Sequence, residues 1–336
     1  MPLGRRNFLH GVLALPAFPL ATHGTRVGSA PVRDGEELAD ALSRARPGDT
    51  ILLAPGEFGG VDEFTVSVPD VTIRASVPLG SILRAPMEVP ADRATIDGLM
   101  FRSEPESGLL LAAVAACRDS LSITGSNTEV RGCDFGYFPG RAILVRPTGK
   151  NPYIHDCTFH NNNDGGDRGG NAHEAISLGY DNPNSRVSLR GRVTNNRFWN
   201  LNVEGEAVSV KTSDNLLQNN QLSSSRGGFT SRYGQRNQFI GNRISNSRGI
   251  AIGGRGCKVA NNTISGTGNI SIQAGNASAD NTRNGVHPQS ADTTVEGNSG
   301  LLLIGNQYRP MPALNTTVRN HKGTVRLVLQ QGTKQS

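Results

Sequence analysis

The chain has 336 residues, of which 41 are glycine, 18% are charged and 5% are aromatic, and its formal net charge is +6. This composition excludes a disordered chain, which would carry more charge, and a mainly helical one, which would be richer in Ala, Leu, Glu and Lys. Subtracting Arg5 and Arg6, which lie in a predicted leader, from +6 leaves +4, a balance that suits either a polyanionic partner or an ordinary basic surface. Because basic residues are scattered and stacking aromatics are few, we expect no nucleic acid partner.

Residues 1–25 contain a paired arginine, Arg5-Arg6, followed by Phe8-Leu9 and a short apolar run that Pro16 and Pro19 interrupt. The run is too short to span a bilayer, and the whole segment resembles a twin-arginine export signal. We therefore expect a periplasmic or secreted protein with no membrane insertion, in which residues 26–336 form a single domain. The alternative is a disordered basic tail.

The first predicted element is an amphipathic helix from Asp34 to Arg46, which carries Leu38 and Leu42 at helical spacing and ends at Pro47-Gly48. A strand from Thr50 to Ala54 follows it. We expect the helix to cap the open end of a solenoid, because that end would otherwise expose unpaired strands.

An internal repeat occupies the middle of the chain. Its pattern is an apolar residue, two residues, a small residue or Asn, one residue, and an apolar residue. Successive final residues are 34, 24, 39, 24, 22 and 20 positions apart. The seven copies run over 96–101, 130–135, 154–159, 193–198, 217–222, 239–244 and 259–264. This spacing predicts the coils of an all-β solenoid, with a stacked Asn ladder at one corner. The repeat becomes irregular beyond about Asn269, although Thr317-Val318 and Val325 to Leu329 still look like strands.

The four cysteines are Cys117, Cys133, Cys157 and Cys257, and none forms a C-x-x-C pair. Metal binding through sulfur is therefore not expected. Cys133 and Cys157 occupy the same position of successive repeats, so they stack either as buried thiols or as a disulfide. We favour buried thiols.

Two neighbouring coils align without gaps, because residues 174–182 match residues 206–214 at an offset of 32. Alternation turns Ile176, Leu178, Val208 and Val210 inward. An outward row then contains Arg146, Gly179, Lys211 and Arg232. Adjacent cations about 4.8 Å apart repel each other, so this row favours a site for an anion. The alternative is two snorkelling surface side chains that happen to align.

Carboxylates lie next to this row. Glu204 and Glu206 flank Gly205, where we expect the chain to bend so that Glu206 points outward. Together with Asn171 and Glu174 of the preceding coil they form a cluster of hard oxygen ligands, which suits Ca²⁺ better than zinc.

The run Glu204-Gly-Glu206-Ala-Val-Ser-Val-Lys211, with Arg232-Tyr-Gly one coil later, resembles polysaccharide lyase family six, the alginate lyases and chondroitinase B. The resemblance covers residues 171–266 and implies a right-handed parallel β-helix. It implies Lys211 as general base and Arg232 as general acid or charge stabiliser, and it implies a Ca²⁺ cofactor held by Asn171, Glu204 and Glu206. The sequence departs from the family at Ser177, Tyr233 and Ala251, where Arg, His and Arg are expected, and the chain is short for the family.

The resemblance implies a β-elimination on an acidic, alginate-like polysaccharide. A lysine, with an ordinary pKa near about 10.4, acts as a base only if that pKa is lowered, as a guanidinium and a Ca²⁺ ion nearby would do. We expect the chain to act as a monomer and to contact its substrate through four residues: Arg146, Glu174, Tyr233 and Arg255.

Three alternatives remain at this point. A non-catalytic β-helix that binds polysaccharide is favoured by the departures at Ser177, Tyr233 and Ala251. A uronan epimerase on the same fold would share the proton removal, but no Asp-Pro-His run is present. A glycoside hydrolase would need two facing acids, for which Glu174 and Glu206 are candidates, but it would leave Lys211 and Arg232 unexplained.

Overall fold

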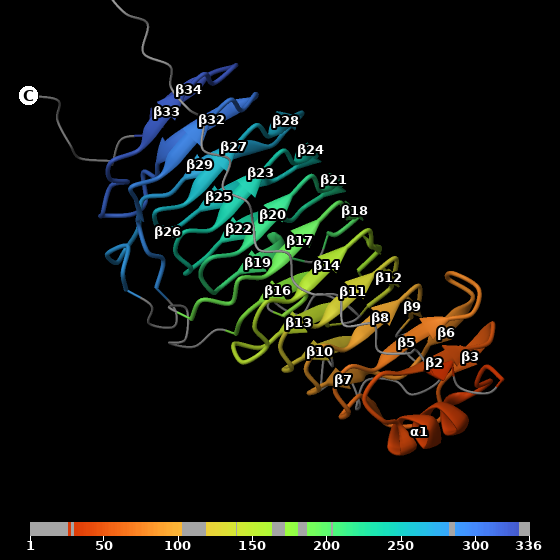
Figure 1. Cartoon of the computed structure of the whole chain (residues 1–336). Helices are drawn as coiled ribbons and strands as arrows, with labels where there is room; N and C mark the ends of the chain where they lie inside the picture. The colour runs from red at the N-terminus through yellow and green to blue at the C-terminus, as the bar shows by residue number, and fades with distance from the viewer. Residues whose placement is uncertain are drawn as a thin grey trace, which may run out of the picture.

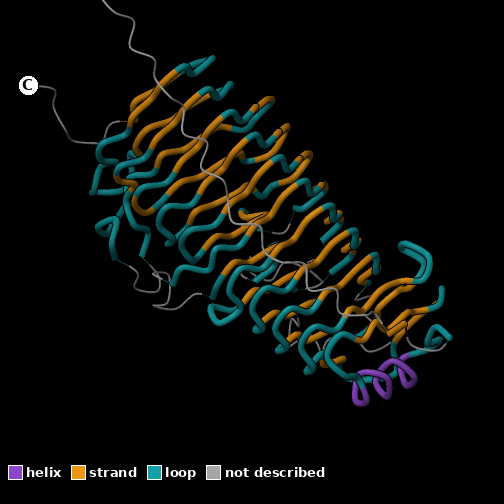
Figure 2. The backbone as a smooth tube through the Cα atoms, in the orientation of Figure 1, coloured by secondary structure: helices purple, strands orange, loops and turns teal. Residues whose placement is uncertain are grey.

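The computed structural model describes residues 26–27, 30–102, 119–138, 140–162, 172–180, 187–202, 204–281 and 286–328. The predicted leader, residues 1–25, lies outside the described residues, so the export signal and its boundary stay predictions. The described chain winds into a long β-helix whose strands form three parallel sheets, and Figures 1 and 2 show the coils stacked from the N-terminal to the C-terminal end.

Sheet A has twelve described strands. They are β1 (Arg26–Val27), β2 (Asp49–Leu53), β5 (Thr72–Ala75), β8 (Thr95–Asp97), β11 (Glu129–Arg131), β14 (Tyr153–His155), β17 (Arg192–Thr194), β20 (Leu216–Gln218), β23 (Gln238–Ile240), β27 (Lys258–Ala260), β31 (Thr294–Glu296) and β33 (Thr317–Arg319). Each strand pairs in parallel with the equivalent strand of the next coil, as a solenoid requires.

Sheet B has nine described strands. They are β3 (Gly56–Phe58), β6 (Ser81–Leu83), β9 (Met100–Phe101), β12 (Asp134–Gly136), β15 (Thr158–His160), β18 (Arg197–Trp199), β21 (Gln221–Ser225), β24 (Arg243–Ser247) and β28 (Thr263–Ser265). Its short strands place two outward side chains on each coil, one at either end of the buried residue between them.

Sheet C has eleven described strands. They are β4 (Phe64–Thr65), β7 (Met87–Val89), β10 (Leu121–Ile123), β13 (Ile143–Val145), β16 (Ile176–Leu178), β19 (Glu206–Val210), β22 (Gly228–Ser231), β25 (Gly249–Ile252), β29 (Asn269–Ile272), β32 (Leu301–Gly305) and β34 (Val325–Val328). A small fourth sheet joins β26 (Gly254–Arg255) to β30 (Ser290–Ala291). The strands predicted at the C-terminal end are therefore confirmed as β33 and β34.

The core is a set of stacked inward rows. Four phenylalanines, Phe101, Phe135, Phe159 and Phe198, stack in line with ring centroids 4.5, 5.0 and 4.8 Å apart. All four are the final residues of the sequence repeat, so the repeat marks one buried row of the solenoid. The parallel stacking of identical rings buries apolar surface on every coil, which no coil achieves alone.

The predicted Asn ladder is present at the corner between sheets A and B. Its members are Asn196, Asn220, Asn242, Asn262 and Asn298, all fully buried. The Oδ1 atom of each accepts from the backbone N–H of the ladder residue one coil earlier, as from Asn220 to Asn242 at 3.0 Å. The left-handed backbone conformation belongs to the residue before each of them, such as Asn195 (φ 59°) and Asn219 (φ 56°). The sequence prediction had one Asn both adopt the left-handed conformation and form the ladder hydrogen bonds. In the structure two adjacent residues divide these roles.

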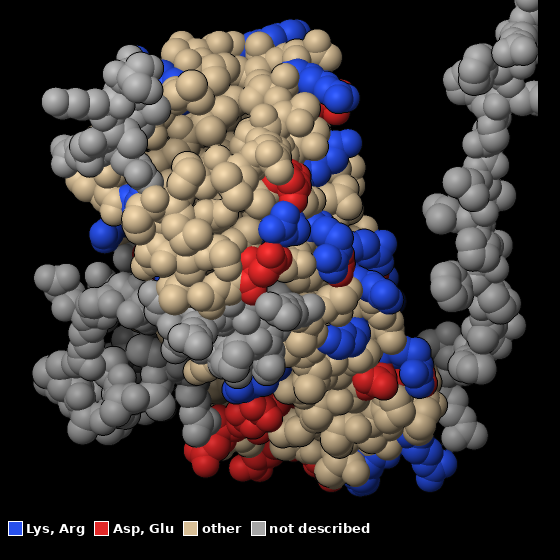
Figure 3. Space-filling model, turned by 90° about the vertical axis from the view of Figure 1, so that its left-hand side faces the viewer, with Lys and Arg blue, Asp and Glu red and all other residues tan. Residues whose placement is uncertain are grey.

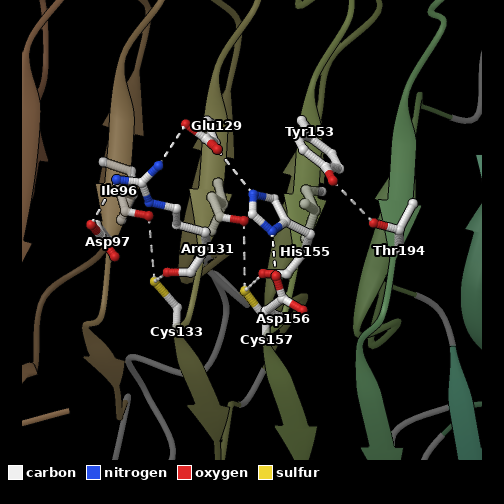
Figure 4. A network of polar contacts seen from close by, with 12 residues as sticks. Ile96, Asp97, Glu129, Arg131, Cys133, Tyr153, His155, Asp156, Cys157 and Thr194 are labelled. Atoms are coloured by element: carbon white, nitrogen blue, oxygen red, sulfur yellow. Dashed lines mark hydrogen bonds and ion pairs between the residues drawn. The ribbon is translucent and has the colours of Figure 1, made fainter. Parts of the chain in front are cut away.

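Cys133 and Cys157 continue this ladder toward the N-terminal end. Both are buried free thiols, which confirms the preferred interpretation, and Cys257 is also buried and free. Cys117 lies outside the described residues. Figure 4 shows the two sulfur atoms beneath a polar network on the outer face of sheet A, in which His155 lies 3.0 Å from Glu129 and 2.6 Å from Asp156.

The N-terminal helix is confirmed as α1 (Gly35–Arg44), which begins one residue later and ends two residues earlier than predicted. Asp34 caps it by accepting a hydrogen bond from Glu37 N at 2.9 Å. Leu38 and Leu42 are buried, and the helix contacts β2, β3 and β4, so it covers the open end of the first coil (Figure 1). Within the described chain, no helix has the length and apolar character needed to cross a membrane.

Asp134 on β12 gives the first testable consequence. Burial raises the pKa of this carboxyl, but hydrogen bonds from His160, Thr158 and Arg102 outweigh that effect and lower the pKa to about 2. Because the folded pKa lies below the unfolded value, the ionised group stabilises the fold above about pH 4, and this stability is lost as the pH falls toward 2. The shift corresponds to about 2 kcal/mol.

We therefore expect urea unfolding of Asp134→Asn to show a free energy about 2 kcal/mol lower than the wild type near neutral pH, and nearly the same near about pH 2. Asp156→Asn provides the control, because Asp156 is exposed and takes no part in the hydrogen bonds from His160, Thr158 and Arg102 that hold Asp134. Equal pH dependence in Asp134→Asn and the wild type would contradict the assignment.

Candidate active site

The register of sheet C brings four charged residues into one column. Ile143 pairs with Leu121 and Ile176, and Ile176 pairs with Val208, so the residues two positions before them lie side by side. This column consists of Asp119, Arg141, Glu174 and Glu206. The offset of 32 between the coils of Glu174 and Glu206 is thereby confirmed.

Glu174 is the most buried member of the column, at 1% exposed. Its Oε2 atom accepts from Arg141 Nε at 3.1 Å, and Arg141 Nη1 also lies 3.1 Å from Asp119 Oδ1. Burial raises the pKa of Glu174, but Lys211 and Arg141 outweigh it and hold the pKa below its ordinary range. Glu174 is thus a buried carboxylate fixed between two cations.

Lys211 follows β19 and is 2% exposed. Its Nζ atom donates to Glu174 Oε1 at 2.8 Å. The inward rows predicted beside it are confirmed, because Ile176, Leu178, Val208 and Val210 all belong to the hydrophobic core. Lys211 therefore lies on the outer side of sheet C, as predicted, but in a buried position.

Arg232 lies next to Lys211, one coil later. The pairing of Val210 with Ser231 puts the two cations at adjacent positions, which confirms the predicted row. Arg232 Nη1 lies 3.1 Å from Glu206 Oε1, and Glu206 also accepts a hydrogen bond from Ser209. The prediction that an external anion must offset the stacked cations was therefore incomplete, because each cation pairs with a carboxylate of the chain itself, Lys211 with Glu174 and Arg232 with Glu206.

A β-bulge turns Glu206 outward. The pairing between β19 and β22 shifts between Glu206 and Val208, so Ala207 is the extra residue. The predicted bend near Gly205 is thus a bulge two residues further along. It places Glu206 on the same side of the sheet as Ser209 and Arg232.

Glu204 differs from the other two glutamates of the site. It is 9% exposed, and its Oε2 atom accepts from His173 N at 3.1 Å. Burial and the nearby charges of Glu174 and Glu206 raise the pKa of Glu204 to about 8. Among the described residues no cation forms an ion pair with Glu204, so this carboxyl is the one that a bound cation would stabilise most.

The predicted metal ligands are only partly placed. Asn171 lies outside the described residues, and Glu204 and Glu206 lie near each other. The described ranges contain no group of three or more His, Cys, Asp and Glu side chains arranged to hold a metal ion. A calcium ion at this site would need further oxygen ligands besides the two carboxylates.

A cavity of about 340 Å³ opens beside the column, on the side of the first coils. Its polar lining comes from Glu63, Glu88, Asp119, Ser122, Arg141, Arg146 and Tyr180. The guanidinium groups of Arg141 and Arg146 lie 5.2 and 5.5 Å from the ring centre of Tyr180. Figure 3 shows acidic side chains gathered at the end of this face that carries the first coils.

The four predicted substrate contacts have different surroundings. Glu174 belongs to the charged column, and Arg146 lines the cavity beside it. Tyr233 is 2% exposed and stacks below Arg232, and its hydroxyl has no hydrogen-bond partner among the described residues. Arg255 lies on β26 and forms ion pairs with Asp280 and Asp292. The structure therefore does not bring Arg255 into contact with the other three, and its substrate role stays a prediction.

Sequence reasoning missed Arg141, Asp119 and Tyr180. A signal for the first two was available, because Arg141 is 33 residues before Glu174 and Asp119 is 22 before Arg141, the same offsets that pair the strands after them. At the departures from the family, Ser177 donates to Gly179 O at 3.0 Å, and Ala251 lies beside Thr230.

Comparisons with known proteins identify the fold. A family model described as a right-handed β-helix region matches residues 181–334. Among solved structures, the chain is similar to a PL6 alginate lyase in complex with a trisaccharide, with 18% identity, 88% of this chain and 80% of that chain covered, and a TM-score of 0.66. It is similar to the PL6 family lyase of Pseudopedobacter saltans, with 18% identity, coverage of 89% and 85%, and a TM-score of 0.65.

The same fold also occurs in a surface protein and adhesin of Streptococcus pneumoniae, with 11% identity, coverage of 87% and 95%, and a TM-score of 0.61. No curated protein matches the sequence. The predicted fold, a right-handed parallel β-helix, is confirmed. Because lyases and an adhesin share this fold, function has to be argued from the site.

Proposed function

We propose that this chain is a polysaccharide lyase that cleaves a uronate-containing acidic polysaccharide by β-elimination. The observation that supports it most is the adjacent pair Lys211 and Arg232 on sheet C, each fixed by a glutamate of the same sheet. The structural similarity to PL6 alginate lyases supports this choice of polymer class, and alginate is the first substrate to test.

Lys211 is the base in this reaction. The ion pair with Glu174 favours charged Lys211, so the positive charges of Arg232 and a bound calcium ion would have to offset it and favour neutral Nζ. Neutral Nζ takes the proton from C5 of the uronate, the C5–H electrons form the C4–C5 double bond, and the C4–O bond breaks. The hydrogen bond to Glu174 holds Nζ at a fixed place, and Arg141 fixes Glu174 in turn. The electrons of the C4–O bond leave on the glycosidic oxygen, which takes a proton from water and becomes the hydroxyl of the released fragment, and Nζ then gives the C5 proton to the solvent.

Arg232 supplies positive charge that does not titrate. A guanidinium stays protonated through the whole pH range of interest, so it stabilises negative charge on the substrate carboxylate or on the leaving oxygen. Its ion pair with Glu206 orients the side chain, and the stacking over Tyr233 limits its movement.

A calcium ion fits the acidic part of the site. Glu174 is paired with two cations and Glu206 with one, whereas the described residues offer Glu204 no ion pair, and its pKa is raised to about 8. Glu204 and Glu206 would hold the ion together with Asn171, all of them hard oxygen ligands. When bound, Ca²⁺ would neutralise the substrate carboxylate and acidify the C5 proton.

We expect removal of calcium to lower the elimination rate by about a hundredfold or more, because the charge that develops on the carboxylate is then uncompensated. Isothermal titration calorimetry of calcium tests the site without turnover. Binding should be lost in Glu204→Gln and kept in Glu129→Gln, a control on the outer face of sheet A. Equal calcium affinity in Glu204→Gln and the wild type would contradict this ligand assignment.

Product analysis tests the reaction class. A lyase releases oligosaccharides that are lighter by one water than the products of hydrolysis, and mass spectrometry separates the two.

We also propose that residues 1–25 direct export and that the chain acts as a monomer. N-terminal sequencing of the exported protein and light scattering of the purified protein test these two points.

A second candidate function is polysaccharide binding without cleavage. The observation that favours it is the buried Tyr233 beside Arg232, where the lyase family is expected to have His. A binder would retain alginate on a column and release no shortened products. Retention together with products would exclude this candidate.

A further inference from the structure

A second row of aromatic and small polar side chains runs along the outer face of sheet B. The strand register aligns Gly136 with His160, His160 with Trp199, and Trp199 with Ser223. The row then continues through Ser245 and Ser265. Sheet B adjoins sheet C, since only Arg226 and Gly227 separate β21 from β22, but its outer face carries none of the residues proposed for the elimination.

Trp199 has one ring face covered and one face next to a small residue. His160 stacks on it with centroids 4.6 Å apart and an angle of 8° between the rings. Gly136 leaves room for His160, because a Cβ atom at position 136 would lie 2.6 Å from His160 Cε1. Tyr137, which is 48% exposed, packs edge-on against the His160 ring. On the opposite side of Trp199 the row neighbour is Ser223, which is too short to cover an indole ring.

A trough lies on the coils that follow Trp199, and its first coil carries Ser223, the row neighbour of the ring. It has a volume of about 460 Å³, and its polar lining comes from Gln221, Ser223, Arg243, Ser245, Thr263 and Ser265. Arg243 and Arg197 belong to the neighbouring outward row and are exposed. Within the part of the chain that the structure describes, neither guanidinium group forms an ion pair, so Arg243 in the trough lining and Arg197 beside Trp199 both carry uncompensated positive charge.

We propose that Trp199 and this trough form a second binding site for an acidic polysaccharide, separate from the elimination site. The ligand class rests on the proposed function, because the polymer held here is the one cleaved on sheet C. A sugar ring stacks on the open indole face, as aromatic side chains bind flat apolar surfaces. Hydroxyl groups of the sugar bond to the serine row, and its carboxylates bind Arg197 and Arg243.

The repeat of the trough suits a polymer. Serine residues recur on three successive coils, at Ser223, Ser245 and Ser265, about 4.8 Å apart, which is close to the length of one sugar unit along a chain. A second site on the same molecule raises the local concentration of polymer at the first. We therefore expect Trp199→Ala to raise KM for long polymer several-fold and to leave KM and kcat for short oligosaccharides unchanged.

The chain contains a single tryptophan, so its intrinsic fluorescence reports on Trp199 alone. The experiment titrates Lys211→Ala protein, which we expect not to turn over, with oligomannuronate, oligoguluronate and oligoglucuronate, and with neutral cello-oligosaccharides. At least one uronate series should give a saturable change in fluorescence. Arg232→Ala, added to the same background, should leave this titration unchanged.

Two further variants locate the ligand. Ser223→Leu fills the trough beside the ring, and the double variant Arg197→Gln/Arg243→Gln removes its charge; each should weaken binding about tenfold or more. Thr294→Leu, a similar change on sheet A, should have no effect. The proposal is overturned by no fluorescence change with any uronate series, by equal binding of neutral oligosaccharides, or by titrations that Ser223→Leu does not alter. A positive titration in a chain without lyase activity would overturn the proposed function and leave the binding site standing.

Discussion

Replacing Lys211 by alanine is expected to lower the elimination rate by about three orders of magnitude, the usual range for loss of a general base. The reason is that Nζ, held 2.8 Å from Glu174 Oε1, is the group in this site able to remove the C5 proton in its neutral form. Turnover is measured by the release of unsaturated products at saturating alginate.

Stability must be measured in the same variant, because Lys211 is 2% exposed and its removal leaves Glu174 with Arg141 as its one cationic partner among the described residues. We expect a loss of about 1–3 kcal/mol in the free energy of unfolding, less than for a buried charge left without any partner. Lys211→Ala/Glu174→Gln should recover stability without recovering activity. Lys258→Ala, an exposed lysine of sheet A, is the matched control. Wild-type turnover in Lys211→Ala would contradict the assignment of the base.

Replacing Asn242 by alanine is expected to lower the free energy of unfolding by about 3–5 kcal/mol, the sum of several buried groups left unpaired. Asn242 is fully buried in the middle of the ladder. Its Oδ1 atom accepts from Asn220 N at 3.0 Å, and its Nδ2 atom donates to Leu217 O at 3.0 Å and to Asn262 Oδ1 at 2.9 Å. One substitution therefore breaks bonds on both neighbouring coils.

Thermal and urea unfolding followed by circular dichroism measures this effect. Gln238→Ala provides the control, because it removes an exposed side-chain amide at the start of β23, the strand that precedes Asn242. It should change the free energy of unfolding by less than about 0.5 kcal/mol. If the two substitutions proved equally mild, the ladder would not be a main source of stability at this corner.

Much of the fold follows from the sequence, because a solenoid repeats its pattern on every coil. The final apolar residue of the repeat marks the Phe row, and the Asn at its centre marks the ladder. The backbone conformation at the corners was harder to predict from the sequence. A pair such as Asn195-Asn196 does not reveal which residue takes the left-handed conformation and which makes the ladder bonds, since Asn suits both.

The site was predicted as far as strand register determines it. The offset between two coils identified Lys211, Arg232, Glu174 and Glu206 correctly as neighbours. Alternation gives the side of the sheet and not the tilt of a long side chain, so the ion pair between Lys211 and Glu174 was missed. Arg141 lies two residues before β13, as Glu174 lies two residues before β16, but it was missed because an Arg stands where the two aligned coils have a Glu.

The most direct test of the proposed lyase is the ultraviolet absorbance of the C4–C5 double bond during incubation with polymer. Purified wild-type protein is mixed with alginate, polyglucuronate and dermatan, first with calcium and then with a chelator, and Lys211→Ala serves as the blank. A rise in absorbance with at least one polymer, reduced by the chelator and absent in Lys211→Ala, is the predicted result. No rise with any of the three, from a protein that is folded and binds calcium, would contradict the proposal of a uronate lyase.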